Sequence, residues 1–369
     1  MKRRFAAALA PLLLCAAPGA AEPRYMGADM SFVNEMEDCG AIYKENGAAK
    51  DPFAILKAHG GNLVRVRLWN DAAWTKYSNL ADVKKTIARA HAQGMQVLLD
   101  FHYSDTWADG DKQIVPAAWA KIADPDALAQ ALYRYTLDTL AALDRDGLMP
   151  DLVQVGNEIN REMLEPEGTK PHPIDWTRNA KLIEAGIRAV RDAGAASAVK
   201  PKVMLHIAQP ENVEPWFADA AKAGVTDFDL IGISYYAKWS KYTIKQLGIE
   251  LVRLGMLYPG KPAVVVETAY PWTTKWKDSQ PNTLGDDSVV PHYGATREAQ
   301  KNYLEDLANT VIASKGAGVV YWEPAWVSTD CKTPWGRGSS WENATLFDFD
   351  GELLPGIDFM KADGTAPLH

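Results

Sequence analysis

In Leu152-Val-Gln-Val-Gly-Asn-Glu158 a short apolar, β-branched run ends in a carboxylate, as the strands of a parallel barrel often do. Ala263-Val-Val-Val-Glu267 repeats this pattern later in the chain. Similar strand-like runs recur with helical stretches between them, and this alternation predicts parallel strands joined by helical crossovers. In a parallel barrel the C-terminal ends of the strands open on one face, which carries the active site. Both glutamates are therefore predicted to stand on that face.

Eight runs have the character of buried strands. They are Tyr25–Met30, Leu63–Leu68, Gln96–Phe101, Leu152–Gly156, Lys202–Ile207, Leu230–Ser234, Ala263–Val266 and Gly318–Tyr321. Helical periodicity is found in Leu80–Gln93, Pro125–Leu143, Asp175–Asp192, Val213–Ala223, Thr243–Leu257 and Thr296–Ser314. Asp51 and Asp124, each followed by proline, predict helix starts, and Gly94 and Gly194 predict helix ends. This order predicts an α/β fold, a single-domain (β/α)8 TIM barrel with long loops at the strand C-terminal face.

The first 21 residues have the three parts of a secretory signal. A charged start, Met1-Lys-Arg-Arg4, precedes the apolar segment Phe5–Cys15 and the small residues Pro18-Gly-Ala-Ala21. The apolar segment is short for a membrane span. We therefore expect a signal peptide over 1–21, a catalytic domain over 22–369, a secreted or periplasmic location, and no membrane partner.

Net charge and aromatic content indicate which kinds of molecule the protein can bind. Removal of the predicted signal, with its three basic residues, takes the formal net charge from −8 to −11. An acidic chain is a poor nucleic-acid binder and is ill suited to a polyanionic substrate, so a neutral polymer is favoured. The 13 Trp and 14 Tyr residues either fill the core or stack on sugar rings in an open cleft. We expect a monomer.

Cys39 and Cys331 are the two cysteines left after the predicted signal. Cys39 follows the first predicted strand and Cys331 follows the eighth, and these strands are neighbours when a barrel closes. In an exported protein the two thiols either form a disulfide or remain as two buried thiols. They lack the spacing of a zinc site.

The two glutamates supply the chemistry for cleaving a glycosidic bond. Glu158 can protonate the leaving glycosidic oxygen, while Asn157 can hydrogen-bond the sugar hydroxyl beside the reacting carbon. Glu267 is the candidate nucleophile. Each motif alone also suits an ordinary strand end, but a pair at strands four and seven of eight is a much stronger indication.

Motifs at successive strand ends carry a family resemblance. They are Gly27-Ala-Asp-Met-Ser31, Val64-Arg-Val-Arg-Leu-Trp69, Asp100-Phe-His-Tyr-Ser-Asp-Thr-Trp-Ala-Asp109, Gln154-Val-Gly-Asn-Glu-Ile-Asn160, Gly232-Ile-Ser-Tyr-Tyr236, Glu267-Thr-Ala-Tyr-Pro-Trp272, Tyr321-Trp-Glu-Pro-Ala-Trp326 and Trp341-Glu-Asn343. Together they resemble the family-53 endo-β-1,4-galactanases, within the large clan of retaining (β/α)8 glycoside hydrolases. The resemblance covers nearly all of the chain after the predicted signal.

This resemblance implies hydrolysis of β-1,4-galactan, the side-chain polymer of type I arabinogalactan, with retention of the anomeric configuration. Glu158 would be the acid/base and Glu267 the nucleophile. Their carboxyl groups should then lie about 5–5.5 Å apart, whereas an inverting pair would need about 6.5–9.5 Å. No cofactor is required by this chemistry.

The resemblance also implies supporting residues around the nucleophile. Arg67 should hold Glu267 ionised and oriented, with Arg65, two residues earlier on the same strand face, as its rival for the role. One of Tyr235 and Tyr236 should donate its hydroxyl to Glu267.

Further substrate contacts are expected from strands three and eight. His102 should bind or support the sugar, and Trp322 and Trp326 should form the floor of the sugar site. Glu323 should point away, because side chains alternate along a strand and Trp322 is the inward residue.

Bacterial members of the family often carry a structural calcium between the loops after strands seven and eight. Here that loop, Thr273–Asp287, offers Asp278, Asn282, Asp286 and Asp287, which are spread out, and it also carries Lys275 and Lys277. We therefore expect no calcium and no other metal site.

Two alternatives stay open. The chain could be an endo-glycanase of the same clan that acts on mannan or glucan. It could also be a non-catalytic protein that binds galacto-oligosaccharides, although a pure binder has no need for the reactive pair.

Overall fold

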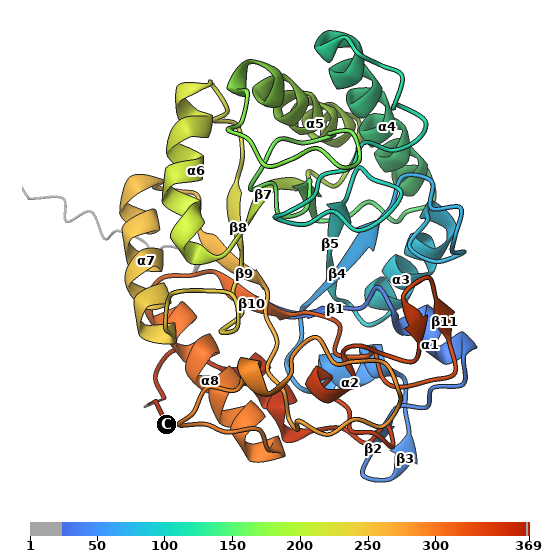
Figure 1. Ribbon diagram of the computed structural model, residues 1–369, viewed down its shortest axis with the longest axis vertical. Coiled ribbons are helices and arrows are strands. Elements are labelled where there is room, and N and C mark those ends of the chain that lie inside the picture. Colours follow the sequence, from blue (N-terminus) through green and yellow to red (C-terminus); the bar gives the residue numbers. More distant parts are fainter. Residues whose placement is uncertain (1–23, 367) are drawn as a thin grey trace, which may run out of the picture.

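The structure is a computed structural model that describes residues 24–366 and 368–369 (Figure 1). The predicted signal peptide over 1–21 lies outside the described residues. Within the described part of the chain, no helix is both long enough and apolar enough to cross a membrane.

Eight parallel strands close into a barrel, with β1 hydrogen-bonded to both β4 and β10. The strands are β1 (Tyr25–Asp29), β4 (Leu63–Leu68), β5 (Gln96–Phe101), β6 (Leu152–Val155), β7 (Lys202–Ala208), β8 (Leu230–Ser234), β9 (Ala263–Glu267) and β10 (Gly318–Tyr321). The predicted (β/α)8 barrel is confirmed, and each strand ends within one residue of its predicted bounds.

Helices form the outer layer of the barrel (Figure 1). They are α1 (Val33–Asp38), α2 (Pro52–Ala58), α3 (Leu80–Ala92), α4 (Pro125–Arg145), α5 (Trp176–Ala196), α6 (Pro210–Lys222), α7 (Ile244–Leu257) and α8 (Arg297–Ala313). Asp51 and Asp124 cap α2 and α4 by accepting hydrogen bonds from backbone N–H groups of the first turn, as predicted. The helix end predicted at Gly194 is wrong, because α5 continues to Ala196.

Short elements decorate the loops. They are the two-residue strands β2 (Lys44–Glu45), β3 (Ala48–Ala49), β11 (Lys332–Thr333) and β12 (Gly336–Arg337), and the 3-10 turns η1 (Asp286–Ser288), η2 (Glu342–Ala344) and η3 (Pro355–Lys361). β2 pairs with β3 and β11 pairs with β12, each as an antiparallel hairpin.

The barrel interior is built in layers. Leu63, Leu98, Leu152 and Met204 belong to a fully buried apolar cluster of inward side chains from the starts of the strands. Because side chains alternate along a strand, the next inward positions lie two residues later. Those positions hold Arg65, Asp100, Gln154 and His206, which are also fully buried. The sequence thus places a polar layer directly above the apolar one, at the end of the barrel where the strands finish.

Cys39 and Cys331 form a disulfide with their Cα atoms 5.6 Å apart. This settles the open question from the sequence in favour of pairing. Cys39 directly follows α1, and Cys331 directly precedes β11, so the bond ties the long segment after β10 to the segment after β1.

Replacing Cys39 and Cys331 together with serine should lower the free energy of unfolding by about 2–4 kcal/mol, since a cross-link restricts the unfolded chain. Guanidinium unfolding followed by tryptophan fluorescence measures the change. Dithiothreitol should destabilise the wild-type protein by a similar amount and leave the double variant unaffected. Equal stability of oxidised and reduced wild type would show that the bond does not stabilise the fold.

Candidate active site

Glu158 stands on a sharp turn at the end of β6. Gly156 and Glu158 both have left-handed backbone conformations, with φ of 85° and 45°, and this is uncommon for a residue other than glycine. The side-chain amide of Gln113 holds the turn by donating to the carbonyl oxygens of Asn157 (2.8 Å) and Glu158 (3.2 Å). A non-glycine residue kept in this conformation by its surroundings is typical of functional sites.

The carboxyl group of Glu158 accepts two hydrogen bonds from neutral donors. Oε1 accepts from the Ser234 hydroxyl at 2.5 Å, and Oε2 accepts from the Gly110 backbone N–H at 3.2 Å. Burial raises the pKa of Glu158, the bond from Ser234 opposes that change, and the negative charge of Asp109 adds to it. These surroundings favour a group that still carries a proton when substrate arrives.

Glu267 is the last residue of β9 and has cationic and phenolic donors. Arg65 Nη1 lies 2.8 Å from Oε1, and the Tyr236 hydroxyl donates to Oε2 at 3.2 Å. Burial raises the pKa of Glu267, the charge of Arg65 opposes the rise, and the carboxyl of Glu158 adds to it. Both donors contact the carboxylate itself and so favour its ionised form.

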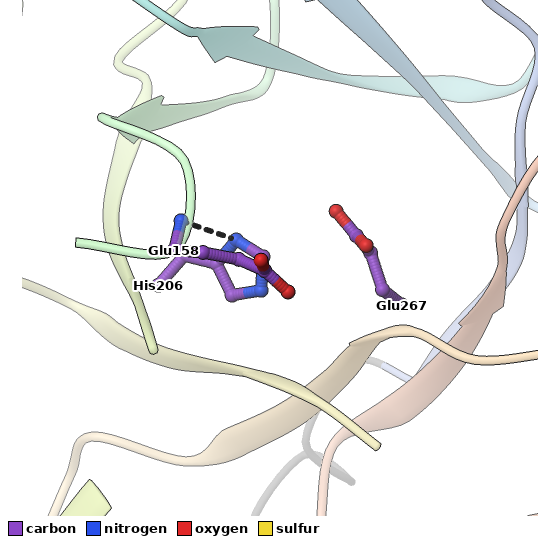
Figure 2. Close-up of side chains that lie close together, drawn as sticks. All are labelled: Glu158, His206 and Glu267. Carbon is purple, nitrogen blue, oxygen red and sulfur yellow. Dashed lines mark hydrogen bonds between the residues drawn. The ribbon is translucent and has the colours of Figure 1, made fainter. Parts of the chain in front are cut away.

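The two carboxyl groups face one another across the site (Figure 2). One oxygen of Glu158, one oxygen of Glu267 and one ring nitrogen of His206 lie within 4.8 Å of one another. This spacing suits a retaining pair and is short for an inverting one. Carboxyl groups this close titrate as a pair. Arg65 and Tyr236 contact Glu267 and not Glu158, and these contacts favour a proton on Glu158.

Arg65 is the centre of the polar layer. It lies on β4 and is 1% exposed. Besides Glu267, its guanidinium donates to Asp29 (2.9 Å), Asp100 (2.8 Å) and Asn157 (2.7 Å). A buried cation needs this degree of pairing, and the paired carboxylates in turn hold it in place.

The prediction that Arg67 holds the nucleophile is wrong. Arg67 pairs with the fully buried Glu323, and its guanidinium lies 4.3 Å from the ring centroid of Phe32 and 4.5 Å from that of Trp107. The two arginines share a strand face, but Arg65 lies one layer deeper, where the strand partners of β4 present their carboxylates. The rival role weighed for Arg65 is the one that the structure supports.

The structure also shows which of the two tyrosines contacts Glu267. Tyr236 contacts Glu267, whereas the Tyr235 hydroxyl donates to the backbone oxygen of Tyr242 at 2.9 Å. The prediction that one of the two tyrosines donates to Glu267 is therefore confirmed for Tyr236, and Tyr235 does not contact the nucleophile. Alternation along the chain explains the difference, since adjacent side chains leave the backbone on opposite sides.

His102 and Asn157 lie beside the carboxylate pair, as predicted. The Nε2 atom of His102 lies 3.0 Å from Asp100, and its Nδ1 accepts from the Ala108 backbone at 3.3 Å. The amide of Asn157 accepts from Arg65 and donates to the Ala108 carbonyl at 2.8 Å, which fixes its orientation. Their contact with sugar stays a prediction.

Trp322 and Trp326 both line the main cleft. Trp322 is half-buried, while Trp326 stacks on Phe32 with ring centroids 3.9 Å apart. Glu323 is fully buried and pairs with Arg67; that it points away from the cleft stays a prediction. The strand-eight aromatics therefore form a wall beside the carboxylates.

The cleft is long and has a volume of about 1230 Å³. Trp176 and Trp216 line it from the start of α5 and from α6, and Trp335 lines it from the β11–β12 hairpin. These elements lie on opposite sides of the barrel in Figure 1. Aromatic rings thus flank the carboxylate pair in both directions, and flat amphipathic rings suit sugar stacking.

Sequence reasoning missed two buried polar residues at the site, His206 on β7 and Ser234 at the end of β8. Both were assigned only to strands. Their signal is a polar side chain at an inward position of an otherwise apolar run, as in Met204-Leu-His-Ile207. That signal is weak by itself, because a satisfied core histidine gives the same pattern.

One candidate metal site lies within the described residues. In that part of the chain, one group of histidine, cysteine or acidic side chains is close enough to share an ion, namely Glu158, His206 and Glu267. Both ring nitrogens of His206 already have protein partners, the Ser234 hydroxyl at 2.8 Å and the Glu158 backbone N–H at 3.3 Å. The arrangement therefore fits a hydrogen-bonded site better than a metal site.

The loop that would hold calcium does not fit that ion. Asp278 accepts from the Ser339 backbone at 2.8 Å and the Ser328 hydroxyl at 2.6 Å, and Asp287 pairs with Lys238 at 3.0 Å. Its carboxylates do not gather into a shared group within the described residues. That the protein needs no calcium stays a prediction.

Known proteins of similar sequence span nearly the whole chain. The chain is 52% identical to "Arabinogalactan endo-beta-1,4-galactanase" of Cellvibrio japonicus, over 98% of both chains. It is 34% identical to "Endo-beta-1,4-galactanase" of Bacillus subtilis, over 91% of this chain and 85% of the other.

Solved structures also match this chain over nearly its whole length. The "Ignisphaera aggregans GH53 catalytic domain" superposes with a TM-score of 0.84 at 32% identity, covering 96% of this chain and 99% of that one. A xylanase catalytic core, at 14% identity and a TM-score of 0.57, shares only the fold. Residues 25–360 match the family described as "Glycosyl hydrolase family 53". The chain therefore belongs to glycosyl hydrolase family 53.

Proposed function

We propose that this protein is an arabinogalactan endo-β-1,4-galactanase that cleaves β-1,4-galactan by a retaining double displacement. The observation that carries the proposal is the pair of Glu158 and Glu267, close together at the ends of β6 and β9 in a chain of this family. The relative from Cellvibrio japonicus, 52% identical over 98% of both chains, supports galactan as the substrate.

In the first step Glu267 attacks the anomeric carbon while Glu158 gives its proton to the glycosidic oxygen. The bond from the anomeric carbon to that oxygen breaks, the leaving chain departs as an alcohol, and a covalent galactosyl-enzyme forms. In the second step the Glu158 carboxylate takes a proton from water, the water oxygen attacks the anomeric carbon, and the bond to Glu267 breaks. Two inversions give net retention.

The surroundings of each glutamate suit its role. Arg65 and Tyr236 stabilise the Glu267 carboxylate before attack and again when it leaves. Asn157 uses one amide hydrogen on the Ala108 carbonyl, so its second hydrogen is available for the hydroxyl beside the reacting carbon. His102 and Trp322 line the inner cavity around the pair and would contact the same sugar.

The cleft supports endo-acting cleavage within a polymer. Aromatic residues line it on both sides of the carboxylates, so sugar units can be bound before and after the scissile bond. The acidic chain suits a neutral polysaccharide. We also propose export to the periplasm or the medium, supported by the sequence of residues 1–21 and by the disulfide. Catalysis as a monomer, without a metal or cofactor, completes the proposal.

The substrate is tested with purified wild type and Glu267→Gln on β-1,4-galactan, galactomannan, carboxymethylcellulose and β-1,3-galactan. Wild type should release reducing ends only from β-1,4-galactan, with a rapid fall in viscosity that marks internal cleavage. Glu267→Gln should lower that rate by about 10⁴-fold or more, since the attacking carboxylate is lost. Activity on another polymer and not on β-1,4-galactan would show that galactan is not the substrate. Inactivity on all four polymers would favour the binding-protein alternative.

Glu158→Gln should lower kcat/KM on β-1,4-galactan by about 10²–10⁴-fold, because the leaving sugar then departs without a proton. The same variant should retain most of its kcat/KM on an aryl β-1,4-galactobioside with a dinitrophenolate leaving group, which needs no protonation. Initial rates on the two substrates measure the ratio. An equal loss on both would show that Glu158 is not the general acid.

Arg65→Lys should lower kcat/KM on both substrates by about 10²-fold, because the contact of Arg65 Nη1 with Glu267 is lost. Arg65 favours ionised Glu267, so its replacement raises the pKa of Glu267. Activity that needs this carboxylate is lost as the pH falls, and the acid limb of the pH profile should therefore move to higher pH. Arg67→Lys is the matched control: it should lower thermal stability and leave the acid limb in place. A shift of the acid limb in Arg67→Lys and not in Arg65→Lys would show that Arg67, as first predicted, holds the nucleophile Glu267.

A further inference from the structure

We propose that His206 and Ser234 form a hydrogen-bond relay that positions the general acid, keeps Glu158 Oε1 as an acceptor and confines the catalytic proton to Oε2. This inference rests on the proposed function, in which Glu158 is the acid/base. Neither residue contacts the reacting atoms in this role, so both are positioning residues.

The contacts form a continuous chain inside the barrel. His206 Nε2 lies 2.8 Å from the Ser234 oxygen, and Ser234 Oγ lies 2.5 Å from Glu158 Oε1. His206 and Ser234 are both fully buried on the neighbouring strands β7 and β8. Water therefore does not reach His206 or Ser234 from the outside of the barrel.

The direction of the relay follows from counting hydrogens. The Ser234 hydroxyl has one hydrogen, so it can donate to Glu158 only if it accepts from His206. His206 must then carry its proton on Nε2, which leaves Nδ1 as an acceptor. The Glu158 backbone N–H at 3.3 Å is a donor for Nδ1, while the two amide hydrogens of Gln154 serve Asp100 at 2.6 Å and Asn157 at 3.1 Å.

The reversed chain is disfavoured. It would place the proton of Glu158 on Oε1 and the proton of His206 on Nδ1, pointing at the Asn157 side-chain oxygen 3.0 Å away. That oxygen already accepts from Arg65 at 2.7 Å and from Gln154 at 3.1 Å, which uses both of its lone pairs. Reversal would also leave the Glu158 N–H without its acceptor. The backbone amide of the acid thus helps to fix the tautomer of the histidine that supports it.

The ring of His206 is neutral, which the relay requires. Burial and the nearby charge of Arg65 hold the pKa of His206 well below its usual range. The neutral ring has one N–H, so the donor chain has a single direction. Hydrogen bonds in such a chain polarise one another, which strengthens donation to Glu158 as its charge develops.

Ser234 therefore sets the strength of the acid. Burial raises the pKa of Glu158, and donation from Ser234 opposes this by stabilising the carboxylate that remains after proton transfer. The charged or titratable groups that face Glu158 are Asp109 after β5, Arg65 on β4, Glu267 on β9, Tyr236 after β8 and His206 on β7. Substitution of Ser234 leaves all of these in place, so it isolates the relay.

The test is the pH dependence of kcat/KM on β-1,4-galactan for Ser234→Ala. Loss of the donor raises the pKa of Glu158, and the protonated acid then persists to higher pH. The alkaline limb should move up by about one pH unit, as expected for one hydrogen bond to a charged group. Activity on galactan should fall about 10–100-fold near neutral pH, while kcat/KM on the dinitrophenyl galactobioside should stay within about threefold. An unmoved limb with equal losses on both substrates would overturn the relay and indicate a packing role.

Variants of His206 test the order of the chain. His206→Met removes the N–H donor to Ser234. It should move the alkaline limb to higher pH by less than Ser234→Ala does, because the Ser234 hydroxyl remains. His206→Gln keeps an N–H near the position of Nε2 and should leave the alkaline limb at its wild-type position. The double variant Ser234→Ala/His206→Met should shift no further than Ser234→Ala alone, since His206 acts through Ser234. Additive shifts would overturn the relay. If Ser234→Ala fails to fold, Ser234→Cys, with a weak donor of similar size, should show the same shift.

Glu158→Gln, assayed in parallel, separates the two proposals. If Glu158→Gln loses activity selectively on galactan and Ser234→Ala leaves the alkaline limb unmoved, the relay alone fails. If Glu158→Gln shows no such selectivity, the acid assignment itself fails.

Discussion

The buried guanidinium of Arg65 is the interaction on which the rest of the site depends. It is 1% exposed and contacts carboxylates from three other strands, Asp29 on β1, Asp100 on β5 and Glu267 on β9. A charge in the centre of a barrel is costly unless it is paired and fully hydrogen-bonded, and each of these carboxylates would be costly without the arginine. The cation and its partners therefore hold the strand ends in one arrangement, and the nucleophile is one of those partners.

The same arrangement separates the two glutamates chemically. Glu267 receives a cation and a phenol, whereas Glu158 receives a serine hydroxyl and a backbone N–H. Glu267 is buried and Glu158 is half-buried, burial raises the pKa of both, and the charge of Glu158 raises that of Glu267 further. The cation contacts Glu267, which favours a proton on Glu158. Two identical side chains thus take opposite roles through their neighbours. The structure of the polar layer, rather than either glutamate alone, makes the site catalytic.

The sequence predicted the barrel well, because each strand is an apolar run with a sharp polar boundary, and the caps at Asp51 and Asp124 have a local cause. Prediction from the sequence failed where the outcome depends on contacts between distant parts of the chain. Gly194 has the residue type of a helix end, yet α5 runs two residues further. Arg65 and Arg67 lie on one strand face, and only the depth of each in the barrel decides which meets Glu267. His206 and Ser234 look like ordinary strand residues until the neighbouring strands bring Glu158 beside them.

The position of Glu267 shows why alternation alone could not place the nucleophile. Val264 and Val266 belong to the inward apolar cluster of the barrel, so strict alternation would turn Glu267 outward. The pairing of β8 with β9 shifts by one residue there: Ile233 is opposite Val265, and Ser234 is opposite Glu267. An extra residue in one strand re-aims the side chain that follows it. Glu267 is thereby brought level with Ser234, so that Ser234 reaches Glu158 while Tyr236, two residues later, reaches Glu267. One three-residue segment at the end of β8 therefore supports both catalytic groups, and this irregularity in the sheet is what lets it do so.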